Sequence, residues 1–273
     1  MKYDLVAIDI DGTLVNSVHQ ISPKVKEAVQ RVVDAGAKIV LCTGRPFPGA
    51  TRYMEELALT KEGDYIINYH GALAQRTDTG DIMVDHQLSY EDMRNWHELT
   101  NEYGVNFQAI RNDGVYMEGT DFYQKSLIES FLNEMPLRVR TLAEMDPEVT
   151  YSKFNLQDNI EAIEALQAGV PEDFHERYTV IRSEADSIEV LNKAASKGRT
   201  LRELADKLGV PQERVMAIGD SGNDIDMVEY AGLGIAMGNA VQEVLDVADV
   251  VTSTNDEDGV AEAIARYFFD ETE

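Results

Sequence analysis

Cysteine, long apolar runs and positive charge are all scarce in this sequence. Its 273 residues include one cysteine, Cys42, so the chain cannot form an internal disulfide. Cys42 follows the apolar residues 39–41, and we expect it to be buried and unreactive. No apolar run approaches the roughly 18 residues of a membrane-spanning helix, and the first residues lack the pattern of a signal peptide. These absences predict a cytoplasmic protein without a membrane partner.

The balance of charge argues against polyanionic partners. The chain has 24 Lys and Arg residues against 50 Asp and Glu residues, which gives a formal net charge of −26. Such a chain repels nucleic acid and anionic membranes at long range, so we expect neither as a partner. It also repels phosphorylated metabolites. A site for them would therefore need local cations or a metal.

Several common ligand-binding motifs are also missing. The sequence has no G-x-x-x-x-G-K-S/T loop for nucleotide phosphates and no G-x-S-x-G elbow. It has no G-x-G-x-x-G stretch after its first apolar run, which argues against a dinucleotide fold. A calcium loop that starts at Asp220 would need Gly at 225 and Glu at 231, where the chain has Ile225 and Ala231.

Apolar runs alternate with helical patterns at both ends of the chain. Short apolar runs at 5–8, 39–42, 65–67 and 215–218 predict buried strands. Helical patterns lie between them, and the first has Ser22 as a predicted N-cap. This alternation predicts a parallel sheet with helical crossovers.

The pattern changes near residue 84 and returns after about residue 190. The predicted helices and strands of this middle part are short and mixed: helices at 89–101, 122–134 and 160–166, and strands at 105–110, 115–118, 151–156, 178–181 and 187–191. The next predicted helix covers 201–208. We therefore expect a Rossmann-like, doubly wound α/β core made of residues 1–83 and 189–273. Residues 84–188 are expected to form a smaller α+β domain inserted into it.

Polar clusters follow three of the predicted strands. The three groups are Asp9 and Asp11, Thr43 and Arg45, and Asp220, Asn223 and Asp224. Each group alone reads as an ordinary turn. The carboxyl ends of parallel strands share one edge of a sheet, however, and ligands bind at that edge. The coincidence of all three clusters therefore predicts a functional site.

The acidic residues of these clusters predict a metal. Asp9 and Asp11 are two residues apart, so an extended backbone can turn both to one side. Two carboxylates this close repel each other unless a cation lies between them or one is protonated. Asp220 and Asp224 add further oxygen ligands, and Mg²⁺ prefers a few carboxylates with water and substrate phosphate. Lys197, just before a predicted helix, could neutralise a phosphoryl oxygen or be a surface lysine.

In this order, the clusters resemble the haloacid dehalogenase superfamily of aspartate-nucleophile phosphatases. The D-x-D-G-T motif of that family matches residues 9–13, and its G-D-x-x-N-D motif matches residues 219–224. Its second motif, a Thr or Ser after a strand, matches Thr43, and its lysine matches Lys197. The resemblance covers nearly the whole chain.

Two further segments, 236–240 and 257–261, resemble the Cof-type subgroup of that superfamily. In this subgroup a cap domain is inserted between the second and third motifs, which is where residues 84–188 lie. One departure is visible, because the subgroup usually has Asn-Gly-Ala where this chain has His70-Gly71-Ala72. His70 could replace the amide, alter the leaving-group side of the site, or be structural.

The resemblance implies a role for each of these residues. Asp9 would attack phosphorus and form an aspartyl-phosphate, while Asp11 would give a proton to the leaving group and later take one from water. Mg²⁺ would be held by Asp9, Asp220 and the backbone carbonyl of Asp11. The resemblance assigns phosphate binding to Thr43, Gly44, Lys197 and Asn223, and supporting or substrate contacts to Asp224, Arg45 and His70.

The implied substrate is a small phosphorylated metabolite, with a sugar phosphate favoured. Flavin mononucleotide and pyridoxal phosphate stay open as alternatives, as does a phosphotransferase or mutase that uses the same intermediate. A catalytically silent binding protein would normally lack one of Asp9, Asp11, Lys197 or Asp220, and all four are present. The expected oligomeric state is a monomer or a weak homodimer.

Overall fold

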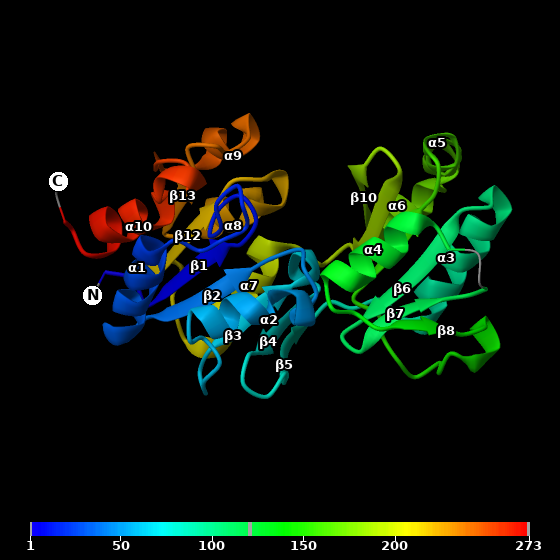
Figure 1. The fold of residues 1–273 in the computed structure, drawn as a ribbon, viewed down its shortest axis with the longest axis horizontal. Coiled ribbons are helices and arrows are strands. Elements are labelled where there is room, and N and C mark those ends of the chain that lie inside the picture. The colour runs from blue at the N-terminus through cyan, green and yellow to red at the C-terminus, as the bar shows by residue number, and fades with distance from the viewer. Residues whose placement is uncertain (1, 120–121, 272–273) are drawn as a thin grey trace. The chain divides into compact units, whose positions relative to one another are not determined.

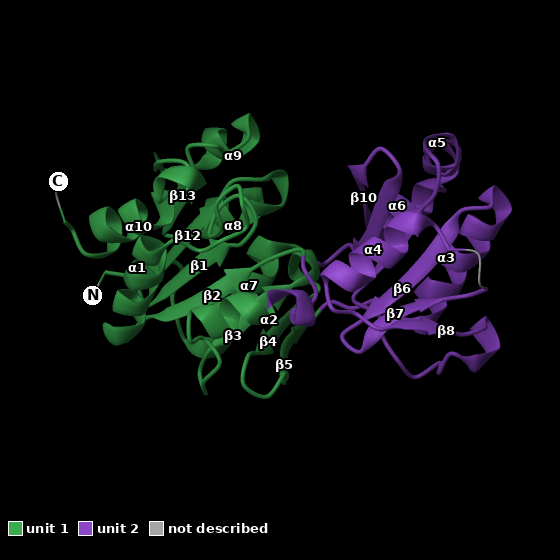
Figure 2. Ribbon diagram, in the orientation of Figure 1, with its two compact units in different colours: residues 1–44, 51–85, 196–273 green, residues 45–50, 86–195 purple. Residues whose placement is uncertain are grey.

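The chain folds into two compact units. The computed structural model describes residues 2–119 and 122–271 (Figure 1). Unit 1 consists of residues 1–44, 51–85 and 196–273, and unit 2 consists of residues 45–50 and 86–195 (Figure 2). Within the described ranges, no helix is long and apolar enough to cross a membrane.

Unit 1 is built on one sheet whose central strands are parallel. From one edge to the other, its strands are β14 (Val250–Val251), β13 (Leu233–Ala236), β12 (Val215–Gly219), β1 (Leu5–Asp9), β2 (Lys38–Cys42), β3 (Tyr65–Asn68), β4 (Leu73–Arg76) and β5 (Ile82–Asp85). All neighbours from β14 to β3 pair in parallel, and β3, β4 and β5 pair antiparallel. The chain runs outward from β1 in both directions, which confirms the predicted doubly wound α/β fold.

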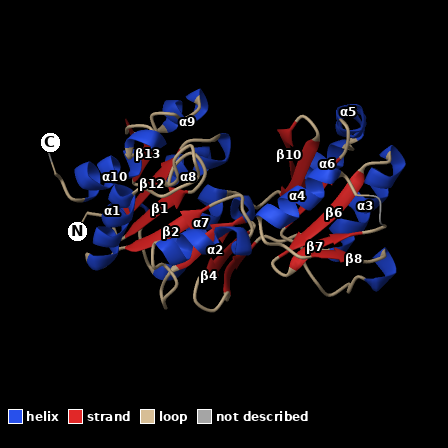
Figure 3. Cartoon of the chain, viewed as in Figure 1, coloured by secondary structure: helices blue, strands red, loops and turns tan. Residues whose placement is uncertain are grey.

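Helices surround the strands of this sheet (Figure 3). The helices in or reaching unit 1 are α1 (Pro23–Asp34), α2 (Phe47–Glu56), α7 (Lys197–Leu208), α8 (Ile225–Tyr230), α9 (Gln242–Val247) and α10 (Gly259–Ala263). Every residue of β1 and β12 is buried, as expected for parallel strands with both faces covered. The predicted cap of α1 is confirmed, because the Ser22 side chain accepts the N–H of Val25.

One helix of unit 1 begins earlier than predicted. We expected it to cover 201–208, but α7 starts at Lys197, and the Ser196 side chain accepts the N–H of Arg199 as its N-cap. Gly198 is a weak helix former, which hid this first turn in the sequence. The difference places Lys197 in the first turn of a helix rather than in the loop before it.

Unit 2 has a six-stranded sheet of its own. In order, its strands are β10 (Tyr178–Glu184), β11 (Ser187–Asn192), β9 (Lys153–Gln157), β6 (Asn106–Arg111), β7 (Gly114–Met117) and β8 (Leu137–Val139). All neighbours pair antiparallel except β7 and β8. Its helices are α3 (Tyr90–Tyr103), α4 (Gln124–Leu132), α5 (Ile160–Gly169) and α6 (Glu172–Arg177). Trp96, Leu166 and Phe154 belong to the buried apolar cluster of this unit.

Helix α4 has its polar side inward. Ser126 and Ser130 are buried, whereas Phe131 is 83% exposed. The Ser126 hydroxyl contacts the side chains of Gln108 and Gln157, both buried on the sheet. The helix is therefore held by hydrogen bonds rather than by its apolar residues.

The limits of unit 2 differ from those of the predicted insert. The predicted boundary at 188/189 falls inside β11, and the unit continues to Ala195. The segment 45–50 also groups with unit 2. That this unit acts as a cap domain stays a prediction.

Candidate active site

Residues from all three polar clusters, Asp9, Thr43 and Asp220, meet at the carboxyl edge of the unit 1 sheet. Asp9 is the last residue of β1 and lies opposite Cys42, the last residue of β2. Thr43 follows directly, and its N–H donates to the carbonyl oxygen of Ile67 on β3. Asp220 follows β12, which is the other neighbour of β1. The parallel register thus brings segments far apart in the sequence to one place.

Three buried carboxylates form the centre of this edge. One oxygen from each of Asp9, Asp220 and Asp224 lies within 4.8 Å of the others. Asp224 Oδ2 accepts the backbone N–H groups of Asp220 and Ser221, each at 3.0 Å. Thr13 Oγ1 donates to Asp220 Oδ1 at 2.7 Å. These bonds fix the side chains of Asp220 and Asp224.

Lys197 links two of the three carboxylates. Its Nζ lies 2.6 Å from Asp9 Oδ1 and 2.6 Å from Asp224 Oδ1, and the side chain is buried. Burial alone would lower the pKa of Lys197, but the charges of Asp224 and Asp9 outweigh it and raise that pKa. Lys197 is therefore a fixed ammonium in the site rather than a surface lysine.

The charges of the site fit a bound cation. Lys197 contacts two of the three clustered carboxylates, and burial, followed by the charge of Asp224, raises the pKa of Asp9 well above its usual range. Burial also raises the pKa of Asp220. Asp9 Oδ2 is buried and has no hydrogen-bond partner among the described residues. A hard divalent cation such as Mg²⁺ would meet all three features, because it takes carboxylate oxygens as ligands.

Asp224 lies in the acidic cluster, although we expected it only in support. The predicted metal ligands were Asp9, Asp220 and the backbone carbonyl of Asp11, and the clustered carboxylates are those of Asp9, Asp220 and Asp224. The Asp11 side chain is 43% exposed, and its Oδ1 lies 3.8 Å from His19 Nδ1. The backbone carbonyl of Asp11 as a ligand stays a prediction.

The loop after β2 and the turn after β3 pack together. The carbonyl oxygen of Thr43 accepts the N–H of His70 at 3.1 Å. Gly44 lies against the His70 ring, and a Cβ at Gly44 would collide with that ring. His70 Nδ1 is 2.8 Å from Asn223 Nδ2, so two predicted residues are in direct contact. Arg45 groups with unit 2, and its role toward a substrate stays a prediction.

Asn239 contacts the loop after β1, and we assigned it no role from the sequence. It follows β13, the next parallel strand beyond β12, and its Nδ2 donates to the carbonyl oxygen of Gly12 at 2.8 Å. Its own Oδ1 accepts the N–H of Asn255 at 3.0 Å. The sequence pattern that indicated Asp9 and Asp220, a polar residue just after a buried strand, is also present at Asn239.

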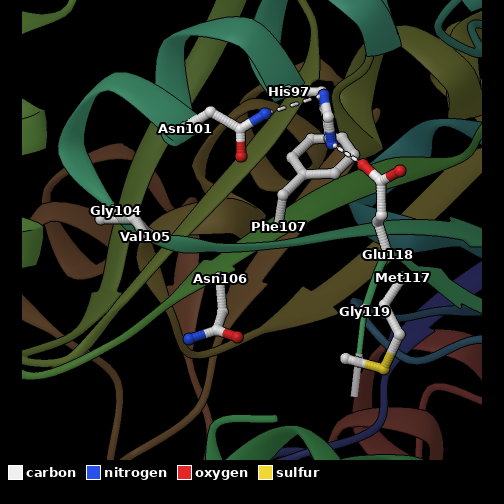
Figure 4. A pocket seen from close by; sticks show the side chains of 9 residues that line it. All are labelled: His97, Asn101, Gly104, Val105, Asn106, Phe107, Met117, Glu118 and Gly119. Carbon is white, nitrogen blue, oxygen red and sulfur yellow. Dashed lines mark hydrogen bonds and ion pairs between the residues drawn. The ribbon is translucent and has the colours of Figure 1, made fainter. Parts of the chain in front are cut away.

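A separate cavity of about 290 Å³ lies within unit 2 (Figure 4). His97 Nε2 is 2.8 Å from Glu118 Oε2, and Asn101 Nδ2 is 3.2 Å from His97 Nδ1. Both ring nitrogens of His97 are thus engaged in the wall of the cavity. We assign no catalytic role to these groups.

Comparison with known proteins identifies the family. The family model of haloacid dehalogenase-like hydrolases matches residues 6–264. The chain belongs to this family of enzymes, which confirms the resemblance stated from the sequence motifs.

Individual relatives match over nearly their whole length. The protein named "Putative phosphatase YxeH" of Bacillus subtilis (strain 168) is 40% identical over 96% of this chain and 97% of its own. The 5-amino-6-(5-phospho-D-ribitylamino)uracil phosphatase YitU of the same organism is 31% identical over 97% of each chain. A crystal structure of a haloacid dehalogenase-like hydrolase from Bacteroides thetaiotaomicron has a TM-score of 0.87 and 31% identity, and covers 97% of this chain and 99% of its own.

Proposed function

We propose that this enzyme is a Mg²⁺-dependent phosphatase that hydrolyses small phosphomonoesters through an aspartyl-phosphate at Asp9. The observation that carries the proposal is the environment of Asp9. One oxygen is held by Lys197, and the other is buried without a described partner, beside Asp220 and Asp224. The names of relatives such as YxeH and YitU support phosphate ester hydrolysis.

In the first half-reaction, a carboxylate oxygen of Asp9 forms a bond to phosphorus while the bond from phosphorus to the ester oxygen breaks. The leaving oxygen takes a proton from Asp11, whose side chain is partly exposed. In the second half-reaction, water attacks phosphorus and gives its proton to Asp11. The bond between phosphorus and Asp9 then breaks, which releases phosphate and restores both carboxyl groups.

The remaining residues are proposed to bind the metal and the oxygens of the phosphoryl group. When bound at Asp9 and Asp220, Mg²⁺ would supply positive charge that offsets the repulsion between Asp9 and the phosphoryl group. Lys197, Thr43, Gly44 and Asn223 would hold phosphoryl oxygens. Asp224 is proposed to orient Lys197, and both of its oxygens are already engaged.

We propose phosphorylated sugars as the preferred substrates. A second candidate is a phosphomonoester with a ribityl chain, because relatives such as YitU, YcsE and YwtE of Bacillus subtilis are named phosphatases of 5-amino-6-(5-phospho-D-ribitylamino)uracil. Both candidates are phosphate esters of polyhydroxylated chains. Flavin mononucleotide and pyridoxal phosphate are the aromatic alternatives.

The test is phosphate release from a panel of esters with Mg²⁺. The panel holds hexose phosphates, the ribitylaminouracil phosphate, flavin mononucleotide, pyridoxal phosphate and a phosphopeptide. We expect one of the polyhydroxylated esters to have the highest kcat/KM, with turnover lost in excess chelator and restored by Mg²⁺. A phosphopeptide preferred at least tenfold over every small ester would contradict the substrate class.

An acceptor alcohol in the same assay separates hydrolysis from transfer. With glycerol present, a phosphotransferase would form phosphoglycerol in place of free phosphate. We expect inorganic phosphate to account for the ester consumed.

A further inference from the structure

The backbone is strained next to the site, at the short 3₁₀ turn after β3 (Tyr69–Gly71). Tyr69 and His70 both have positive φ values, 49° and 56°. A non-glycine residue is uncommon in this left-handed region and persists where its surroundings hold it. Two consecutive residues of this kind indicate that the position of the His70 ring matters.

Three contacts hold His70 in this conformation. Its backbone N–H donates to the carbonyl oxygen of Thr43 at 3.1 Å, and its ring lies against Gly44, where a side chain would collide with it. Its Nδ1 lies 2.8 Å from Nδ2 of Asn223. The ring thus connects the loop after β2 with the turn after β12.

The contact with Asn223 fixes which way its amide points. Nδ2 of Asn223 can only donate, so Nδ1 of His70 must accept and the ring proton of neutral His70 belongs on Nε2. Oδ1 at the other end of the amide lies 3.5 Å from Lys197 Nζ, a long contact. A reversed amide would turn its NH₂ group toward the ammonium of Lys197, where two donors repel. The contacts at Nδ2 and at Oδ1 therefore support the same orientation of the Asn223 amide.

We infer that His70 is a positioning residue that acts through Asn223 on Lys197. By accepting from the Asn223 amide, it keeps Oδ1 facing the ammonium that also binds Asp9 and Asp224. Without this acceptor the amide can rotate, and Lys197 loses one of the oxygen neighbours that the described residues give it. The catalytic part of this inference rests on the proposed phosphatase function, and the placement of the ring proton does not.

The decisive comparison is between two amide variants of His70. In H70N, the side-chain oxygen stands one bond beyond Cγ, where Nδ1 stands in histidine, and Asn also tolerates a left-handed backbone. In H70Q, the oxygen is one carbon farther out and the Nδ1 position has no acceptor. We expect H70Q to lower kcat by about three- to tenfold, the equivalent of one hydrogen bond, with a smaller change in KM. H70N should keep kcat within about twofold of the parent enzyme.

The pair of variants also separates positioning from folding. Equal losses of kcat in H70N and H70Q, with thermal midpoints unchanged, would overturn the role of the Nδ1 acceptor. So would full activity in H70Q, because no acceptor would then be needed. A loss that appears only in KM would likewise overturn it, since Lys197 is proposed to act on the transferring phosphoryl group.

A second measurement needs no activity. The chain has five histidines, so the ¹⁵N ring signals of His70 can be assigned by comparison with H70N. At a pH where His70 is neutral, we expect its proton on Nε2 and a bare Nδ1. A proton on Nδ1 would overturn the inference even if the enzyme proved to be a phosphatase. A bare Nδ1 would support it even if no phosphatase activity were found.

Discussion

Asp9 differs from the other two buried carboxylates in the bonding of its oxygens. Both oxygens of Asp220 and both of Asp224 accept hydrogen bonds, whereas only Oδ1 of Asp9 does so among the described residues. Asp220 and Asp224 are thus committed to fixed positions. Asp9 retains an uncommitted oxygen, which is what a nucleophile requires.

Replacing Asp9 with Asn should abolish turnover and leave the fold intact. The amide has nearly the same shape but cannot form the acyl phosphate. Asp11→Asn is the matched variant, and it should lower kcat by roughly 10²–10⁴ because it removes the acid and base. The measurement is phosphate release from the best ester, with circular dichroism as the control for folding. Asp9→Asn with more than a few per cent of the parent activity would contradict covalent catalysis.

Mg²⁺ should stabilise the metal-free protein against heat. The three clustered carboxylates repel one another, and a bound cation removes that repulsion. At 100 times its dissociation constant, a ligand of the folded state adds about 2.7 kcal/mol to the free energy of unfolding. The thermal midpoint should therefore rise with Mg²⁺ in the parent enzyme and rise less in Asp220→Asn. A midpoint insensitive to Mg²⁺ in the parent enzyme would contradict a metal site at these residues.

Cys42 should resist alkylation as long as unit 1 is folded. Its side chain is buried at the end of β2, and burial raises the pKa of the thiol, so the reactive thiolate is scarce near neutral pH. Alkylation by iodoacetamide, followed by mass spectrometry, should be slow in buffer and fast in denaturant. Rapid modification of the folded protein would show that the end of β2 opens.

Most residues of the candidate active site could be predicted from the sequence. Asp9, Thr43 and Asp220 each follow a buried apolar run, and parallel pairing brings the ends of such runs together. The burial and the hydrogen bonds of these side chains depend on segments far apart in the sequence, so they could not be predicted. Asp224 therefore entered the prediction as a supporting residue, although its carboxylate lies in the acidic cluster.

Among the elements, helix α7 connects the fold to the site. It starts at Lys197, so the lysine that binds Asp9 and Asp224 is fixed by the first turn of a helix. Gly71, in the turn after β3, packs against the backbone of Ser196 immediately before it. Two segments more than 100 residues apart thus determine where Lys197 lies.

A pair of glycine variants tests this contact. Gly71 (φ +97°) and Gly36 (φ +90°) have similar left-handed backbones, but only at Gly71 would a Cβ collide with Ser196, since nothing lies within 4 Å at Gly36. Gly36→Ala should lower the free energy of unfolding by about 1–2 kcal/mol, the cost of left-handed backbone alone. Gly71→Ala should lower it further and reduce kcat as well. Urea unfolding followed by circular dichroism measures the free energy of unfolding, and phosphate release measures kcat. Equal losses of stability and of kcat in the two variants would contradict a role for the contact between Gly71 and Ser196.

Two kinds of element were hard to predict: short strands, and a helix whose polar side faces the interior. A helix was predicted at 89–101, and α3 covers Tyr90–Tyr103 with a capping box of Ser89 and Asp92 at its start. The antiparallel strands β4 and β5 are short and were not predicted. The 122–134 region was correctly predicted as helical, but not that α4 would place Ser126 inward and Phe131 outward. That arrangement depends on Gln108, a partner on another strand.

Each unit of the molecule has a complete apolar core of its own. Leu5, Val40 and Leu201 belong to a buried cluster of unit 1, and Trp96 and Phe154 belong to one of unit 2. The parallel pairing in unit 1 followed from the alternation of strands and helices. The end of the insert did not, because the predicted boundary divides β11, which belongs whole to unit 2.

At the scale of the whole molecule, we predict that the insert determines which ester is preferred. The described contacts of the carboxylate cluster join Asp9, Lys197, Asp220 and Asp224, all of unit 1. These residues are proposed to handle the phosphoryl group, which is the same in every phosphomonoester. Discrimination between leaving groups must then come from other residues, and we assign it to unit 2.

An exchange of the insert tests this division, with junctions set by the structure. Residues 86–195 are replaced by the matching segment of a relative with a different measured preference, which keeps β11 whole and leaves Ser196 to cap α7. The donor segment keeps Asn at position 133, because the segment 45–50 stays in place and Gly49 lies against that side chain. We expect the ranking of esters by kcat/KM to change at least tenfold toward that of the donor, while the Mg²⁺ requirement stays with the core. A folded, active chimera with the original ranking would show that the core itself selects the substrate.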